Sequence, residues 1–201
     1  MTKKILLFTL ICAGLAACQT LPTASEYLVR GDGFVKDGKI PQAIKAYNKA
    51  LAMNPDLTAV YASRGAAYFF SGDYARAQED FLTVVEKNPY QADGYTALGS
   101  ALAARGDYQN AIKMFDISVR LNPRKPETFF SRAGVFLMLK EYDKAIADYT
   151  SVILLAPAAD VYNARGAAYL QKGEQEKAQK DFITARNGAM PDKLNDYRMI
   201  D

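Results

Sequence analysis

The chain has 201 residues, half of them apolar, and a formal net charge of +3 at neutral pH. This length and apolar content suffice for a substantial core, while the small charge gives no electrostatic footprint for nucleic acid. Histidine is absent, which removes the commonest metal ligand and the usual general base at neutral pH.

The first 17 residues have the organisation of an export signal. Lys3 and Lys4 form a basic start, and the apolar run 5–17 closes on small residues. The run is shorter than the roughly 20 residues of a membrane-spanning helix. The end of the run, Leu15-Ala16-Ala17-Cys18, resembles the bacterial lipobox. This resemblance implies loss of residues 1–17 and attachment of lipid such as palmitate to Cys18. An ordinary signal peptide followed by a chance cysteine is the alternative.

The residue after the cysteine bears on the location. It is Gln19, whereas aspartate there is the enterobacterial signal for inner-membrane retention. The resemblance therefore implies the cell envelope, at the periplasmic face of the outer membrane. Processing lowers the formal charge from +3 to +1, because residues 1–17 contain two lysines. The segment 18–23 holds the cysteine and a linker that reaches at most roughly 18 Å, so we expect the protein to work close to its membrane.

From residue 24 onward one pattern recurs. Its clearest copy, residues 58–91, places aromatic and small residues and a proline at fixed positions: Tyr61, Gly65, Tyr68, Ala77, Phe81 and Pro89. The period of about 34 residues and these residue types are those of the tetratricopeptide repeat. The sequence therefore predicts an all-α fold, a right-handed α-solenoid of five repeats and ten antiparallel helices. The expected bounds are 24–57, 58–91, 92–125, 126–158 and 159–192, followed by a tail at 193–201.

Each recurring residue has a physical role. The small residue in the first helix and the alanine that opens the second let the two helices approach closely, and the aromatic residues fill the space between hairpins. Proline ends the second helix because it has no N–H. The pairs Gly72-Asp73, Gly106-Asp107 and Gly173-Glu174 fit glycine C-caps at the turns. Stability is then expected to come from stacking of neighbouring hairpins.

Two repeat positions change together. The seventh position is arginine and the twenty-third is aspartate in repeats two, four and five, and both become apolar in repeat three. We therefore predict three Arg–Asp pairs that bridge the two helices of a hairpin: Arg64 with Asp80, Arg132 with Asp148, and Arg165 with Asp181. A row of arginines that binds an acidic ligand is the alternative.

The sequence contains no pattern for catalysis. It has no nucleophile elbow, no phosphate-binding glycine loop and no metal-spaced cluster. Its repeated aspartates occupy one structural position, which indicates an architectural role. We therefore expect no enzyme activity, no cofactor and no metal site, although an enzyme is the alternative from a different class.

Over nearly all of the mature chain, these features resemble the bacterial tetratricopeptide-repeat lipoproteins of the NlpI adaptor and PilF/PilW pilotin types. The resemblance implies a membrane-anchored protein-binding scaffold or adaptor of the cell envelope, whose partner is an envelope protein or peptide. A pilotin-like assembly factor for a type IV pilus or secretin is an alternative. An accessory protein that holds a small hydrophobic ligand is another.

In relatives of this type the partner binds the concave face, which the first helix of each repeat lines. The matching positions here are mostly small and apolar, and the Lys/Asn/Arg set that clamps a free carboxylate is missing. The candidate groove residues are Phe69, Phe70, Phe130, Leu137, Met138, Ser63, Ser100 and Asn163. Such a surface suits an apolar or amphipathic segment of a partner. Alternatively, some of these side chains, Phe69 and Leu137 above all, belong to the core.

The C-terminal end offers one further expectation. A solenoid normally needs a polar cap at each end, and only residues 193–201 follow the last repeat. Tyr197, Met199 and Ile200 either fold back over the last helix or leave that face open for a second copy, which would give a homodimer.

Overall fold

The structure is a computed structural model that describes residues 22–188. Within them the chain forms ten α-helices in five hairpins and no β-strand. The first helices of the hairpins are α2 (Ala24–Lys36), α4 (Thr58–Phe70), α6 (Ala92–Ala104), α8 (Pro126–Met138) and α10 (Ala159–Lys172). The second helices are α3 (Ile40–Met53), α5 (Tyr74–Lys87), α7 (Tyr108–Leu121), α9 (Tyr142–Leu155) and α11 (Gln175–Arg186). The predicted all-α solenoid is confirmed. The export signal, Cys18 and the tail 193–201 lie outside the described residues.

Local sequence explains where the helices begin and end. The first helix of each hairpin begins at the first residue of an expected repeat. Thr23 and Glu26 form a capping box that satisfies backbone N–H groups at the start of α2, and the Asp73 and Asp107 side chains cap α5 and α7. In the first four hairpins the second helix ends two residues before a proline, which has no N–H to continue it.

A residue with left-handed backbone closes every hairpin turn. Four of the turns use glycine, with φ between 72° at Gly38 and 90° at Gly173. The fourth hairpin instead places Lys140 there, with φ of 59°. Three of the glycine turns were predictable from the sequence, but the turn at Lys140 was not, because lysine as a residue type does not indicate a left-handed conformation.

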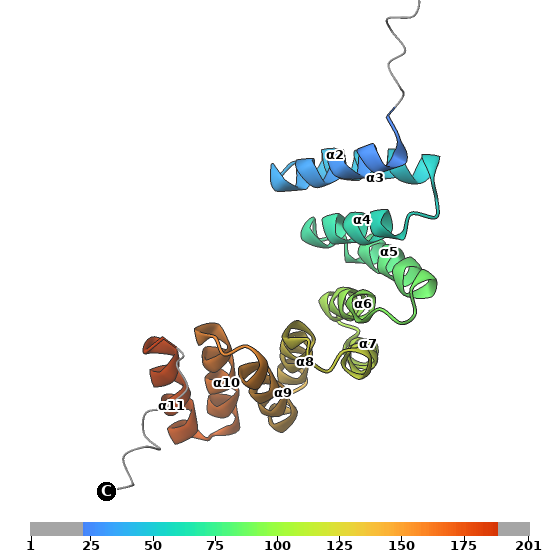
Figure 1. Cartoon of the computed structure of the whole chain (residues 1–201). Helices are drawn as coiled ribbons and strands as arrows, with labels where there is room; N and C mark the ends of the chain where they lie inside the picture. Colours follow the sequence, from blue (N-terminus) through green and yellow to red (C-terminus); the bar gives the residue numbers. More distant parts are fainter. Residues whose placement is uncertain (1–21, 189–201) are drawn as a thin grey trace, which may run out of the picture.

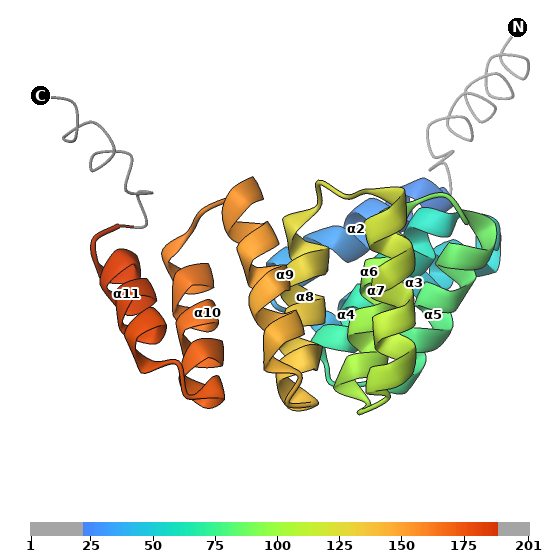
Figure 2. The same ribbon diagram turned by 90° about the horizontal axis from the view of Figure 1, so that it is seen from below.

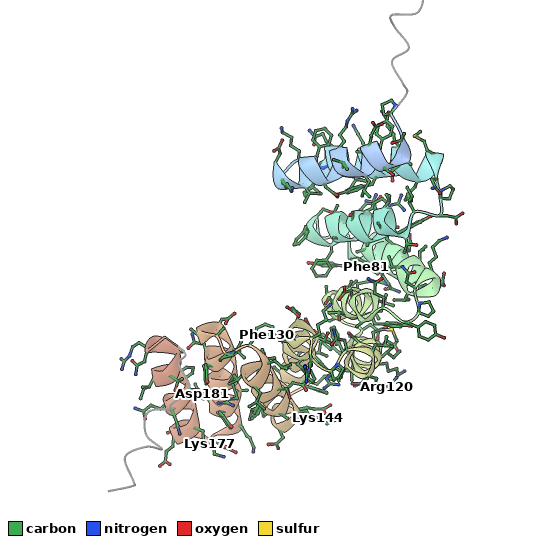
Figure 3. All side chains as sticks on the ribbon, viewed as in Figure 1. Phe81, Arg120, Phe130, Lys144, Lys177 and Asp181 are labelled. Carbon is green, nitrogen blue, oxygen red and sulfur yellow. The ribbon has the colours of Figure 1, made fainter. Side chains whose placement is uncertain are left out.

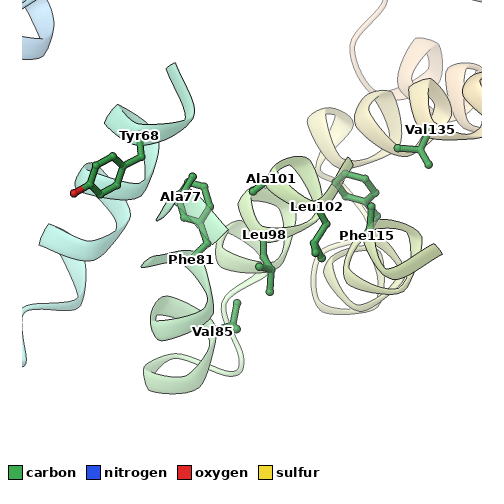
Figure 4. Close-up of a cluster of buried hydrophobic side chains, with 10 residues drawn as sticks. Tyr68, Ala77, Phe81, Val85, Leu98, Ala101, Leu102, Phe115 and Val135 are labelled. Atoms are coloured by element: carbon green, nitrogen blue, oxygen red, sulfur yellow. The ribbon is translucent and has the colours of Figure 1, made fainter. Parts of the chain in front are cut away.

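Close approach of the two helices depends on the small residue in the first helix. A Cβ added to Gly65 would lie 2.8 Å from the Phe81 ring, and one added to Gly99 would lie 2.7 Å from Phe115. The aromatic residue of the second helix therefore fills space inside its own hairpin, over the glycine. It also joins the core shared with the next hairpin, where Phe81, Leu98, Phe115 and Val135 belong to one buried cluster (Figure 4).

The hairpins stack in a bend. In Figure 1 the first helices α4, α6 and α8 line the inner side, and their partners α5, α7 and α9 lie on the outer side. Figure 2 shows that the loops between hairpins gather at one edge, where α2 begins and α11 ends, whereas the turns within hairpins lie at the opposite edge. Among residues 22–188 no helix has the length and apolar character to span a lipid bilayer.

Candidate functional site

The three predicted arginine–aspartate pairs are confirmed. Arg64 donates from Nε and Nη2 to the two carboxylate oxygens of Asp80, at 2.9 and 2.7 Å. Both hydrogen bonds measure 2.8 Å between Arg132 and Asp148, and the same two bonds join Arg165 to Asp181. These hydrogen bonds raise the pKa of each arginine above its usual value. The paired charges therefore serve the architecture rather than an acidic ligand.

Each paired arginine also links two hairpins and lies against an aromatic ring. Arg64 Nη1 donates to Asn48 of the preceding hairpin at 2.6 Å, and Arg165 Nη1 reaches Thr150 at 3.0 Å. The guanidinium of Arg64 lies 5.6 Å from the centre of the Tyr61 ring, and that of Arg165 lies 5.6 Å from Tyr162. Stacking and pairing together hold each guanidinium in one orientation.

The third hairpin replaces this pair with apolar packing. Leu98 is 2% exposed and belongs to the central core, and Met114 packs against the same cluster. Nearby, the hydroxyl groups of Thr96, Ser118 and Thr128 share hydrogen bonds of 2.7–3.1 Å between α6, α7 and α8. Sequence reasoning missed this buried hydroxyl cluster, since threonine and serine on a helix give no signal of which face they occupy.

Three predicted groove residues expose a large side chain. The exposed fraction is 75% for Phe70, 65% for Met138 and 39% for Phe130. Phe70 and Met138 are the last residues of α4 and α8. In Figure 3 Phe130 lies on the inner side of the bend, while Lys144 of α9 lies on the outer side. The Phe130 ring also packs edge-on against the buried ring of Tyr149, with 5.4 Å between ring centres.

The other predicted groove residues are less accessible or less apolar. Phe69 and Leu137 are half-buried and pack against two core clusters. This packing agrees with the alternative that the two side chains belong to the core. Ser63 and Ser100 are also half-buried, and the Ser100 hydroxyl donates to the Thr96 carbonyl at 2.9 Å. Asn163 is exposed on α10. The exposed part of the candidate site therefore centres on α4 and α8.

One polar interaction between α2 and α3 is already satisfied within the fold. The Tyr47 hydroxyl donates to Asp32 Oδ1 at 2.7 Å. Burial and this carboxylate raise the pKa of Tyr47 well above its ordinary value. Asp32 therefore serves to hold α3 against α2. Across residues 22–188, no three aspartate or glutamate side chains gather in a way that could hold a metal ion.

Sequence reasoning missed a cavity on the first hairpin. Its volume is about 250 Å³. Residues of α2 and α3 line it: Tyr27, Arg30, Phe34, Gln42, Lys45, Ala46 and Lys49. The sequence signal that marks it is Ala46, which occupies the position of the paired aspartates in a repeat that keeps its arginine.

Family models and solved structures agree on the fold. Models described as TPR or tetratricopeptide repeat match residues 31–72, 62–126, 96–157 and 159–185. The crystal structure of MamA is 29% identical, with a TM-score of 0.71 over 78% of this chain and 92% of that one. A thermophilic TPR protein of Thermus thermophilus is 23% identical, with a TM-score of 0.68 over 86% and 94%. YrrB, described as a TPR protein with an unusual peptide-binding site, is 22% identical, with a TM-score of 0.65 over 85% and 88%.

A comparison with curated protein sequences gives no significant match. The repeats, the stacked hairpins and the solved structures are nevertheless consistent with one another. Relatives of this fold are typically scaffolds without catalytic activity. The chain belongs to the tetratricopeptide-repeat proteins, and it is a protein–protein interaction scaffold.

Proposed function

We propose that this protein is a membrane-anchored adaptor of the bacterial cell envelope that binds an apolar or amphipathic segment of a partner protein. The binding surface, here called the inner surface, consists of Phe70, Phe130, Gly134 and Met138. The observation that carries the proposal is the exposure of Phe70 and Met138, at 75% and 65%, on α4 and α8. These two helices line the inner side of the bend (Figure 1). Large apolar side chains exposed together on one side of a fold are typical of interaction sites, whereas single exposed ones are common.

The spacing on α8 favours a partner segment that lies along the helix. Phe130, Gly134 and Met138 are separated by four residues each, so they share one face of α8. A Cβ added to Gly134 would meet nothing within 4 Å, which leaves room for a partner to approach the helix backbone between the two larger side chains. Methionine adapts its shape to different partners, and full burial of a phenylalanine or methionine contributes about 1.5–3 kcal/mol.

The membrane anchor is the second part of the proposal, and the lipobox resemblance of residues 15–18 supports it. Residue 18 precedes the start of α2 at Ala24 by six positions. Because α2 begins at the edge that carries the loops between hairpins (Figure 2), a lipid on Cys18 would hold this edge close to the bilayer. The inner surface would then face along the periplasmic side of the outer membrane.

The test is an affinity capture from detergent-solubilised envelope with Phe70→Glu/Met138→Glu. These side chains are more exposed than Phe130, which packs on Tyr149, so the variant should keep its fold. Tyr90→Glu/Leu154→Glu is the matched control, because both residues are exposed, at 88% and 81%, and lie outside α4 and α8. Tyr90 is in the loop between α5 and α6, and Leu154 is on α9. We expect a partner that the wild type and the control capture and that the inner-surface variant loses.

Capture of the same partner by all three proteins would contradict the inner surface as the binding site. The identity of a lost partner separates the alternatives, since a secretin or pilus subunit would indicate a pilotin-like assembly factor. Native mass spectrometry of the purified wild type tests the small-ligand alternative. A retained hydrophobic molecule that Phe70→Glu/Met138→Glu releases would replace the adaptor proposal.

A further inference from the structure

The cavity on the first hairpin contains an arginine, Arg30, at the repeat position of the paired arginines but without their aspartate. Arg30 lies 5.4 Å from the centre of the Tyr27 ring, and the equivalent distance is 5.6 Å for Arg64, Arg132 and Arg165. Each of those three arginines binds an aspartate of the second helix. No carboxylate among residues 22–188 forms an ion pair with Arg30.

The residue opposite Arg30 is alanine. Ala46 has the repeat position of Asp80, and the two residues are equally buried, at 5% and 4% exposed. The alanine side chain ends at Cβ, so the place that the Asp80 carboxylate fills beside Arg64 is open space beside Arg30. Since no hairpin precedes the first one within the described residues, this space opens to solvent.

The charge around the cavity has one sign. Its lining includes Arg30, Lys45 and Lys49 and no acidic side chain, and Lys49 Nζ lies 5.5 Å from the centre of the Tyr27 ring. The fifth hairpin provides an internal comparison, because its cavity of about 390 Å³ has the same repeat positions as lining. There Asp181 stands in the place of Ala46 and occupies Arg165 with its own carboxylate.

We infer that the first-hairpin cavity binds a carboxylate side chain from an acidic segment of a partner protein. The carboxylate takes the place of the missing aspartate and accepts two hydrogen bonds from Arg30, in the geometry that Asp80 adopts with Arg64. Lys45 and Lys49 supply attraction at the rim, and Tyr27 and Phe34 provide apolar walls. The planar guanidinium of arginine is suited to such bidentate hydrogen bonding with a carboxylate. This site is separate from the inner surface and does not depend on it.

The test measures fluorescence anisotropy of a labelled peptide with two glutamates flanked by leucine, added to the detergent-solubilised full-length protein. The same peptide with two glutamines is the neutral control. We expect the glutamate peptide to bind at least tenfold more tightly than the glutamine peptide. Equal binding of the two peptides would overturn the inference, because a carboxylate site must distinguish a carboxylate from an amide.

Two variants locate the binding at this cavity. Ala46→Asp supplies an internal carboxylate to Arg30, so it should weaken binding of the glutamate peptide at least tenfold without loss of thermal stability. Ala52→Asp, an exposed position on the same helix, adds the same charge away from the cavity and should change binding less than threefold. Arg30→Gln is the second loss variant, which keeps the test valid if Ala46→Asp folds poorly. Binding by both loss variants at the wild-type level would refute the site.

Discussion

At the scale of single residues, the arginine–aspartate pairs show how the chain manages charge at the junction of three helices. The Arg64 and Asp80 side chains are only 20% and 5% exposed, so neither charge is well solvated without the other. An unpartnered charge at such a place is costly, whereas replacement of both residues by apolar ones is often tolerated. In the third hairpin both charged residues are replaced by apolar ones, because Leu98 and Met114 occupy the same two positions.

Removal of one partner should therefore lower the free energy of unfolding more than replacement of both partners by apolar residues. We expect Asp80→Ala to lower the free energy of unfolding by about 2–4 kcal/mol, because Arg64 loses its carboxylate and keeps its charge. Arg64→Leu/Asp80→Met copies the third hairpin, and its free energy of unfolding should fall less than that of Asp80→Ala. Urea denaturation followed by circular dichroism measures both values. The pair would have no structural role if Asp80→Ala unfolded at the same urea concentration as the wild type.

The pairs were predictable because one sequence contains several copies of each position, which reveals residues that change together. The accessibility of the groove residues was not predictable from the sequence. Phe69 and Phe70 are adjacent aromatic residues, yet Phe69 packs against the core and Phe70 is 75% exposed. The residue types are identical, so only the packing of α4 against its neighbours decides which ring faces water.

At the scale of the elements, the hairpin turns combine one common geometry with one unfavourable residue. The other four turns use glycine at the left-handed position, and the fourth uses Lys140 with φ of 59°. This conformation brings a Cβ close to the following carbonyl oxygen, which costs about 1–2 kcal/mol for an ordinary residue. The turn still forms, because the Lys140 N–H donates to Leu137 O and the Glu141 N–H donates to Phe136 O.

Glycine at this turn should stabilise the protein. We expect Lys140→Gly to raise the free energy of unfolding by about 1 kcal/mol. The flexibility of glycine in the unfolded chain offsets part of the gain from removing the backbone strain. Lys140→Ala is the control, since it removes the charge but keeps the Cβ. Differential scanning calorimetry should show a higher Tm for the glycine variant alone. Equal gains from both variants would indicate that charge, and not backbone strain, limits this turn.

At the scale of the whole molecule, the last hairpin of the stack differs from the others. The aromatic residue that fills each hairpin is buried in the interior, as with Phe115 at 0%, but Phe182 of the last hairpin is 37% exposed. Its neighbour Ile183 is 41% exposed, and no later hairpin among residues 22–188 covers α11. Coverage by the tail 193–201, or by a second copy in a homodimer, stays a prediction. The repeat pattern alone could not decide between them, because it describes contacts between neighbours and the last hairpin has one neighbour only.

The proposed membrane anchor depends on one residue, Cys18. A lipid on Cys18 would hold the protein in the membrane through its buried methylene groups, at about 0.8 kcal/mol each, although residues 22–188 contain no helix that could span a bilayer. We expect Cys18→Ser to move the protein from the membrane fraction to the soluble fraction and to abolish labelling by a palmitate analogue. Cys12→Ser is the matched control, because Cys12 lies within the expected signal and should leave both readouts unchanged. Membrane retention of Cys18→Ser without label would show that a partner, and not a lipid, holds the scaffold at the envelope.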